Sequence, residues 1–164
     1  MKQSKRVFAM IMALIMVISL IPVSVFAAEV PTFSISSVNG NPGDEVEVKV
    51  SISNNPGIMV MNYKIVYDTT RLERVEFTGY GMGGGVWTIG ENTDKALWDD
   101  ATDSTFNGDI MTLKFKIKEN APVGDAKISI KDFDIVNEAD DEIIPNMVAG
   151  KVSVVAKPVT GISL

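Results

Sequence analysis

Apolar and polar residues alternate along most of the chain from Phe33 onward. In residues 45–54, EVEVKVSISN, a valine or isoleucine occupies every second position and polar residues lie between them. Successive side chains of a β-strand point to opposite faces, so this pattern predicts a strand with one buried face. The preceding NGNPGD combines residues that tolerate positive φ with a proline. We therefore expect a tight turn that joins this strand to an earlier one at 32–38.

The same alternation predicts short strands along the rest of the chain, at 59–68, 72–78, 86–89, 95–99, 109–118, 127–135, 143–148 and 151–155. Turn residues separate them every 8–12 residues or so, and no segment has a convincing helical period. The alternation changes phase near Asp132, and Pro145 leaves the phase of 143–148 open. About nine short strands without a helix predict an all-β sandwich.

The first residues have the order of an export signal. Basic residues within 1–6 precede an apolar stretch at 7–21, and small residues follow up to Ala28. We expect residues 1–27 to be a signal peptide and 28–157 to be a secreted domain. An uncleaved membrane anchor is the alternative, although the apolar stretch is short for a span of about 20 residues.

Composition narrows the classes of function. The full chain has a net charge of −6, and without the three basic residues of the first segment 12 basic and 21 acidic residues remain, which gives −9. Such an acidic chain is unsuited to nucleic acid or to anionic lipid. Since histidine and cysteine are both missing from the sequence, Ser-His-Asp and Cys-His catalysis and the common zinc sites are excluded.

Carboxylates are the remaining candidates for chemistry. Two groups lie close in sequence: Asp99, Asp100 and Asp103, and then Glu138, Asp140, Asp141 and Glu142. Glycoside hydrolysis needs two carboxyls across a cleft, whereas neighbours at a strand end or in one loop are normally solvated. Calcium at either group is conceivable, but neither has the spacing of an EF-hand. We expect no catalytic residue, no metal site and no cofactor in this chain.

Several motifs follow one another in the order of a known family. They are FSISSV, NPGDEVEVKVSI, NNPGI, YDTTRLERVEF, APVGDAKISI and GKVSVV. With this order and spacing the chain resembles a cohesin domain, the receptor module of cellulosome scaffolds, over residues 30–156. The resemblance implies a nine-stranded jelly-roll β-sandwich that binds a dockerin, a small helical module that carries calcium and is appended to polysaccharide-degrading enzymes. Residues 158–164 are expected to be a linker or the truncated start of a domain similar to bacterial group-2 immunoglobulin-like domains.

The resemblance also implies a binding surface. Cohesins receive the dockerin on the sheet made by the family's strands 8, 3, 6 and 5. We take 59–68 as strand 3, 95–100 as strand 5 and 109–118 as strand 6, and leave strand 8 unassigned because of Pro145. The outward residues expected to bind the dockerin are then Val60, Asn62, Lys64, Val66, Leu97, Asp99, Asp100, Thr112 and Lys114.

Two other functions stay open at this point. A carbohydrate-binding module would contact polysaccharide directly and would need exposed aromatic rings, for which Tyr80, Trp87 and Trp98 are the candidates. Trp98 is expected in the core by alternation, Tyr80 lies in a glycine-rich loop, and Trp87 is ambiguous. A structural spacer of a surface protein would need no binding face, and Val60 and Val66 would then be ordinary surface residues.

Overall fold

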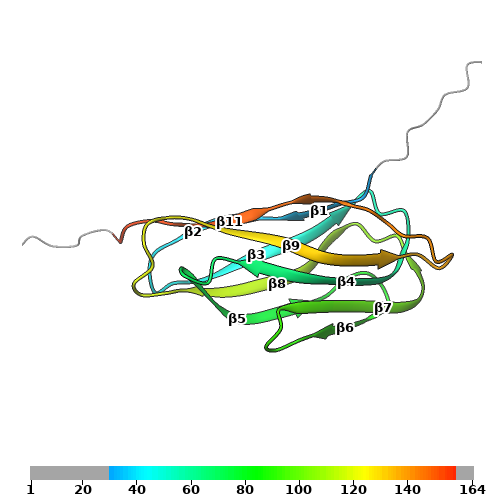
Figure 1. The fold of residues 1–164 in the computed structure, drawn as a ribbon, viewed down its shortest axis with the longest axis horizontal. Coiled ribbons are helices and arrows are strands. Elements are labelled where there is room, and N and C mark those ends of the chain that lie inside the picture. The colour runs from blue at the N-terminus through cyan, green and yellow to red at the C-terminus, as the bar shows by residue number, and fades with distance from the viewer. Residues whose placement is uncertain (1–29, 158–164) are drawn as a thin grey trace, which may run out of the picture.

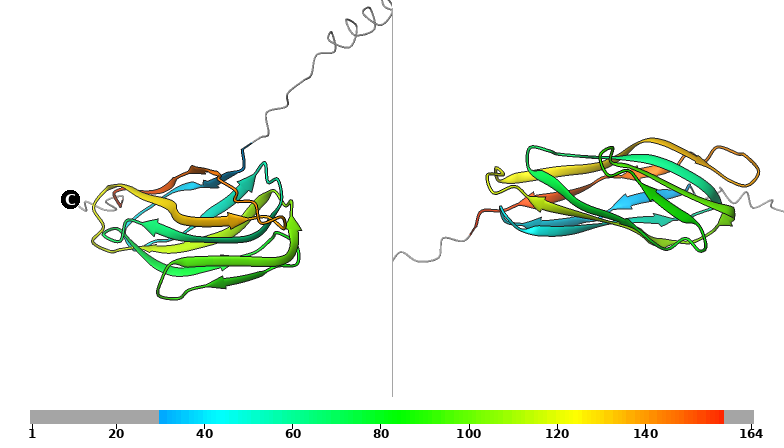
Figure 2. Two further views of the ribbon diagram at one scale, coloured as in Figure 1. Left: turned by 45° about the vertical axis from the view of Figure 1, so that its right-hand side comes forward. Right: turned by 90° about the horizontal axis from the view of Figure 1, so that it is seen from below.

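The computed structural model describes residues 30–157, which form two β-sheets packed face to face (Figure 1). One sheet has five strands, in the order β10 (Asn146–Val148), β1 (Thr32–Ile35), β3 (Glu45–Ser53), β8 (Gly108–Ile117) and β5 (Leu72–Gly79). The other has six, in the order β2 (Ser37–Gly40), β11 (Gly150–Val154), β9 (Gly124–Val136), β4 (Ile58–Tyr67), β7 (Lys95–Ser104) and β6 (Val86–Ile89). Figure 2 shows the two layers from other directions.

The expected all-β sandwich is confirmed, with eleven strands in place of about nine. The segment 32–38, expected to be one strand, is two. β1 pairs with β3 and β10, while β2 pairs with β11 in the other sheet. Phe33 and Ile35 are buried before the crossing at Ser36, and Gly40 is buried after it. The buried positions change phase because the core lies on the opposite side of the chain once it has changed sheets.

The inward side chains of both sheets form one apolar core. Trp98, Tyr63, Phe33 and Phe115 are the largest fully buried side chains. The Tyr63 hydroxyl lies 3.9 Å from the Met111 sulfur, and burial raises the pKa of Tyr63. No helix occurs among residues 30–157, and so none of that part of the chain is a candidate membrane-crossing helix.

A β-bulge explains the predicted phase change near Asp132. Asp132 has a positive φ of 50°, and the register between β4 and β9 shifts between Asn62 and Lys64. An extra residue in one strand lets Ile130 and Ile135 both face the core although they are an odd number of positions apart. The segment at 143–148 contributes only the short β10, which pairs in parallel with β1.

The turn between β4 and β5 depends on Asp68. Its carboxylate accepts hydrogen bonds from the Thr70 hydroxyl at 2.5 Å, the Thr70 N–H at 2.9 Å and the Arg71 guanidinium at 2.6 Å. The Thr70 hydroxyl and the Arg71 guanidinium hold the pKa of Asp68 below its usual 3.8. These bonds favour the ionised folded state, so the stability that they contribute is complete above the unfolded pKa and is lost as pH falls through the folded pKa.

We predict that Asp68→Asn lowers the free energy of unfolding at neutral pH by about 1–2 kcal/mol, the size of lost charge-assisted hydrogen bonds. At about pH 2 the difference between the two proteins should shrink, because protonation of the wild-type carboxyl increases as the pH falls. Urea unfolding at both pH values measures this. Asp109→Asn is the control, since no ion pair or side-chain hydrogen bond of Asp109 occurs within residues 30–157. An undiminished loss at low pH would contradict the prediction.

Candidate functional site

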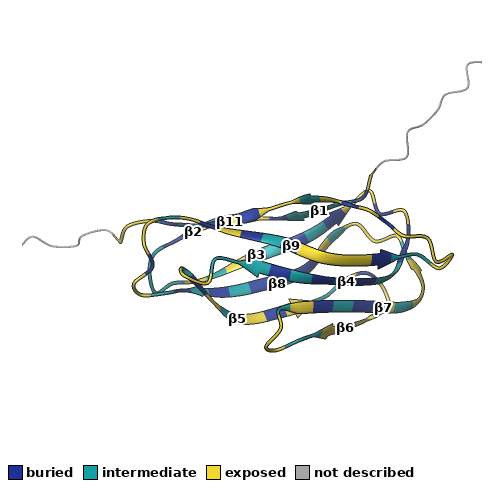
Figure 3. Ribbon diagram, in the orientation of Figure 1, coloured by how far each residue is buried: buried dark blue, intermediate teal, exposed yellow. Residues whose placement is uncertain are grey.

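The outward side of β9, β4, β7 and β6 is a continuous four-strand surface, which we call the outer face. The backbone pairing between neighbouring strands determines which outward residues lie side by side in a row across this surface. Asn62 lies between Asp134 of β9 and Leu97 of β7, and Thr88 of β6 follows Leu97. The next row contains Val136, Val60, Asp99 and Val86. Buried and less buried residues alternate along most of β4 and the first part of β7, while the later parts of β7 and β9 are mostly exposed (Figure 3).

Six of the expected binding residues lie together on this outer face: Val60, Asn62, Lys64, Val66, Leu97 and Asp99. All six except the exposed Asp99 are half-buried. Their inward neighbours Met61, Tyr63, Ile65 and Trp98 are core residues. The alternation therefore predicted correctly which side of β4 and β7 faces outward.

Asp100 departs from that group. It follows Asp99 in the strand, so its side chain starts on the other side of β7. Its carboxylate accepts the N–H of Ala101 at 2.6 Å and lies beside Gly84 of the glycine-rich loop. The expectation that Asp100 shares a surface with Asn62 is wrong.

Thr112 and Lys114 lie on the opposite sheet, which corrects their assignment. They belong to β8, between β3 and β5, and point outward from the five-stranded sheet. Thr112 is hydrogen-bonded to the Lys49 ammonium at 3.1 Å and to the Tyr80 hydroxyl at 3.0 Å. Lys114 pairs with Glu45 at 2.8 Å, and this hydrogen-bonded pair raises the pKa of Lys114 and lowers that of Glu45. β7, expected to be the family's strand 5, lies directly beside β4, which is the place of strand 6 in the family's order 8, 3, 6 and 5.

Residues of β9 and β6 complete the outer face, and they are absent from the binding residues expected from the sequence. β9 contributes Ser129, Lys131, Asp134 and Val136, while β6 contributes Val86 and Thr88. Val86 is 61% exposed, the largest exposure among the apolar residues of this surface. The phase change near Asp132 was a usable signal, because it divides β9 into two outward-facing runs.

The candidate aromatic residues do not form a sugar-binding row. Trp98 is fully buried, and Trp87 packs edge-on to Tyr63 and against Gly79. The Tyr80 hydroxyl lies against the five-stranded sheet, where it accepts a hydrogen bond from the Lys49 ammonium at 2.8 Å. Three rings in three different environments cannot stack on one polysaccharide chain.

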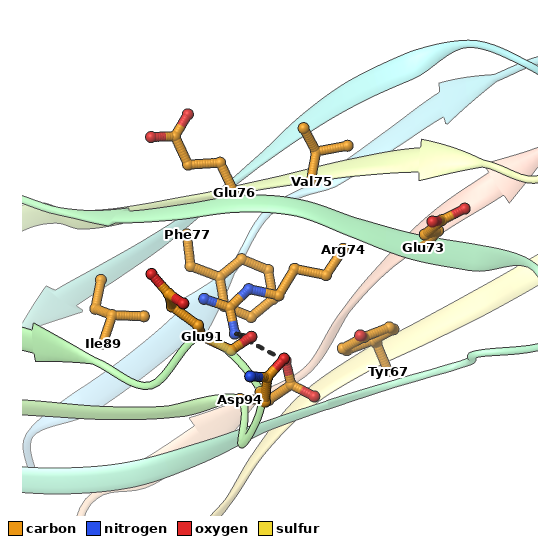
Figure 4. A pocket seen from close by; sticks show the side chains of 10 residues that line it. Tyr67, Glu73, Arg74, Val75, Glu76, Phe77, Ile89, Glu91 and Asp94 are labelled. Atoms are coloured by element: carbon orange, nitrogen blue, oxygen red, sulfur yellow. Dashed lines mark hydrogen bonds and ion pairs between the residues drawn. The ribbon is translucent and has the colours of Figure 1, made fainter.

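An open cavity of about 710 Å³ lies at one edge of the sandwich between β5 and the turn after β6 (Figure 4). Arg74 occupies its centre. Its guanidinium lies over the Phe77 ring and donates to the carbonyl of Gly90 at 2.7 Å and to Asp94 at 3.2 Å. These contacts tie β5 to the β6–β7 turn, so Arg74 serves the packing of this edge. Residues 30–157 hold no cluster of three or more acidic side chains arranged to bind a metal ion.

The arrangement of two sheets and the sequence agree with one family. The family model for the cohesin domain matches residues 31–154. The chain belongs to the cohesin family. Cohesins are non-catalytic binding modules, which agrees with the expectation of a non-enzymatic domain at residues 31–154.

Individual cohesins and scaffold proteins are similar to this one. It is 31% identical over 147 residues to cellulosomal-scaffolding protein B of Acetivibrio thermocellus, covering 76% of this chain and 18% of that protein. Thus the cohesin spans less than a fifth of the length of that relative.

Solved structures share the fold. The sixth cohesin of scaffoldin B from Acetivibrio cellulolyticus, in complex with a mutant Cel5 dockerin, has a TM-score of 0.69 and 26% identity, covering 77% of this chain and 100% of that one. A non-cellulosomal cohesin from the archaeon Archaeoglobus fulgidus has a TM-score of 0.67 at 16% identity, covering 77% and 92%. At 16% identity, the similarity to the archaeal cohesin shows a shared fold and nothing more.

The two terminal predictions lie outside the described residues. These are the signal peptide at 1–27 and the linker or immunoglobulin-like start at 158–164. They stay predictions from the sequence.

Proposed function

We propose that this cohesin binds dockerin domains of polysaccharide-degrading enzymes through the outer face of β9, β4, β7 and β6. The observation that carries the proposal is the composition of that surface. Val60, Val66 and Leu97 are half-buried apolar side chains, and Asn62, Asp99 and Asp134 lie among and beside them. An apolar centre with a polar rim is the usual anatomy of a protein interface.

The chemistry of each group supports a helical partner. Val60 and Leu97 provide apolar area that a helix can cover, whereas a helix's polar side chains can hydrogen-bond the Asn62 amide and the Asp99 carboxylate. The cohesin from A. cellulolyticus was solved in complex with a dockerin, which favours this partner over polysaccharide.

We also propose an extracellular location. The expected export signal at 1–27 would bring the module at 28–157 to the cell exterior, where it would gather enzymes on a scaffold or cell surface. The similarity to a cellulosomal scaffold protein supports this assignment. Tandem modules of such a scaffold would each present an outer face to one enzyme.

A binding panel tests the proposal. The purified secreted chain is titrated by calorimetry with several calcium-loaded dockerins and, in parallel, is mixed with cellulose and xylan. We expect at least one dockerin to bind with a Kd below about 1 μM and to lose that affinity in EDTA, because the dockerin carries the calcium. Binding to polysaccharide but to no dockerin would contradict the proposal, and no binding to either class would favour a spacer.

Variants of the outer face locate the interface in the same assay. Asn62→Ala and Asp99→Ala should each weaken dockerin binding about tenfold, since each removes a polar partner of the helix. Lys114→Ala is the matched control, because it lies on the opposite sheet. Unchanged affinity in both outer-face variants would move the interface elsewhere.

A further inference from the structure

Three lysines form a row across the outer face. Lys64 of β4 lies directly opposite Lys131 of β9 on one side and Lys95 of β7 on the other. All three point away from the core, since Tyr63, Ile65, Ala96 and Ile130 beside them are buried. We call Lys131, Lys64 and Lys95 the lysine row.

No salt bridge within residues 30–157 engages a lysine of the lysine row. The four ion pairs of this part of the chain use Arg71, Arg74, Lys114 and Lys151. The nearby carboxylates of Asp68 and Asp94 are already held by Arg71 and Arg74. Like charges directly opposite each other in a sheet are destabilising, so the row costs the free domain stability. A cluster of three positive charges also contrasts with the net charge of the chain, which is −6.

The other end of the outer face has the opposite charge. Asp134 lies beside Asn62, and Asp99 lies beside Val60. At about 3.3 Å per residue, these carboxylates are roughly 7 and 13 Å along β4 from the lysine row. The apolar residues Val60 and Leu97 lie at the acidic end, while Val66 lies just beyond the lysine row in a shallow hollow of about 290 Å³ that Lys127 and Lys131 also line.

We infer, on the basis of the proposed function, that the lysine row is a subsite for carboxylates of the dockerin helix and sets the direction in which that helix lies. A helix rises about 1.5 Å per residue, so 13 Å corresponds to about nine residues, or two and a half turns. A helix aligned with β4 that covers Val60 therefore also passes over Lys64. The preferred dockerin helix carries Asp or Glu at one end of the side that faces the sheet. About two turns away, on the same side, it carries a basic or hydrogen-bond-donating residue over Asp99 and Asp134.

This arrangement makes the two possible directions of the helix unequal. In one direction its carboxylates meet the lysine row, and in the reverse direction they meet Asp99 and Asp134. Complementary charge across an interface favours one register and raises the association rate, whereas like charge suppresses the wrong one.

The test uses Lys64→Gln, Lys95→Gln, Lys131→Gln and the triple variant, with a dockerin that binds the wild-type chain. Lys116→Gln is the matched control, since it removes the same charge from the five-stranded sheet. We expect the triple variant to bind at least about tenfold more weakly at low salt, with a smaller loss of affinity as salt is added. Its thermal stability should equal or exceed that of the wild type, because repulsion is removed.

Replacing the facing carboxylates of the dockerin by amides should reproduce the weakening and should add nothing to the triple variant. If the triple variant keeps its affinity and salt dependence while Asn62→Ala weakens binding, this inference is overturned and the proposed function stands. The inference is overturned also if dockerin affinity is kept and retention on heparin is lost, which would assign the row to a polyanion. If no dockerin binds the wild-type chain, the proposed function fails first and this inference fails with it.

Discussion

Replacing Leu97 by glutamate is expected to weaken dockerin binding by at least about a hundredfold, the largest effect of any single change on the outer face. Leu97 lies between Asn62 and Thr88, near the centre of the four strands. The substitution removes apolar area from the place where a covering helix would exclude water, and it buries a carboxylate near Asp99 and Asp134 without a counter-charge. Calorimetric titration with a dockerin that binds the wild type measures the loss.

The fold should survive this change. Leu97 points outward while its neighbours Ala96 and Trp98 fill the core, so urea unfolding should differ little from the wild type. Val75→Glu is the matched control, since Val75 is a 45% exposed apolar residue on β5 of the other sheet. An affinity of Leu97→Glu within threefold or so of that control would show that the energetic centre of the interface lies away from β7.

Trp98→Ala is expected to have the largest effect on stability, a loss of about 3–5 kcal/mol, which is a large part of what a domain of this size possesses. Trp98 is the largest fully buried side chain, and Gly85 of the glycine-rich loop packs directly on its ring. Alanine would leave a cavity that rigid strands on both sides cannot close. Urea denaturation of the two proteins gives the difference in unfolding free energy.

Trp98→Phe separates volume from polarity at the same position. The indole N–H of Trp98 is buried and finds no acceptor among the described residues. Phenylalanine keeps most of the volume and removes that unsatisfied donor, so we expect a loss well below that of alanine. Equal losses for the two variants would contradict the account based on cavity volume.

The sequence was sufficient for those features that depend on one strand at a time. The alternation in 45–54 and 59–68 determined which side chains enter the core, because a strand's period of two is a local property. Sheet membership is not local. β7 and β8 have similar alternation, yet one lies beside β4 and the other beside β3, and only long-range pairing decides between them. Thr112 and Lys114 were misplaced for that reason.

Irregular strands were harder to predict. The crossing at Ser36 divides a continuous alternating segment between two sheets, and the inward side is opposite in the two halves. In β9 a single extra residue at the bulge lets Ser129 and Lys131 face outward on the same side as Asp134, although Lys131 and Asp134 are an odd number of positions apart. The resemblance placed most of the expected binding residues on β4 and β7, but the part of the outer face contributed by β9 needed the register of β9 with β4.

The parallel pairing of β2 with β11 also has a consequence for the order of events during biosynthesis. Among residues 30–157, β2 is the outermost strand of its sheet and pairs there with β11 alone, with Ser37 opposite Lys151. A chain that emerges from its N-terminus must hold residues 37–40 unpaired until almost the whole domain has been delivered. Contacts this far apart in sequence close late and slow the folding of a protein. β11, the last strand of the domain to be synthesised, therefore supplies the pairing partner of β2, one of the first.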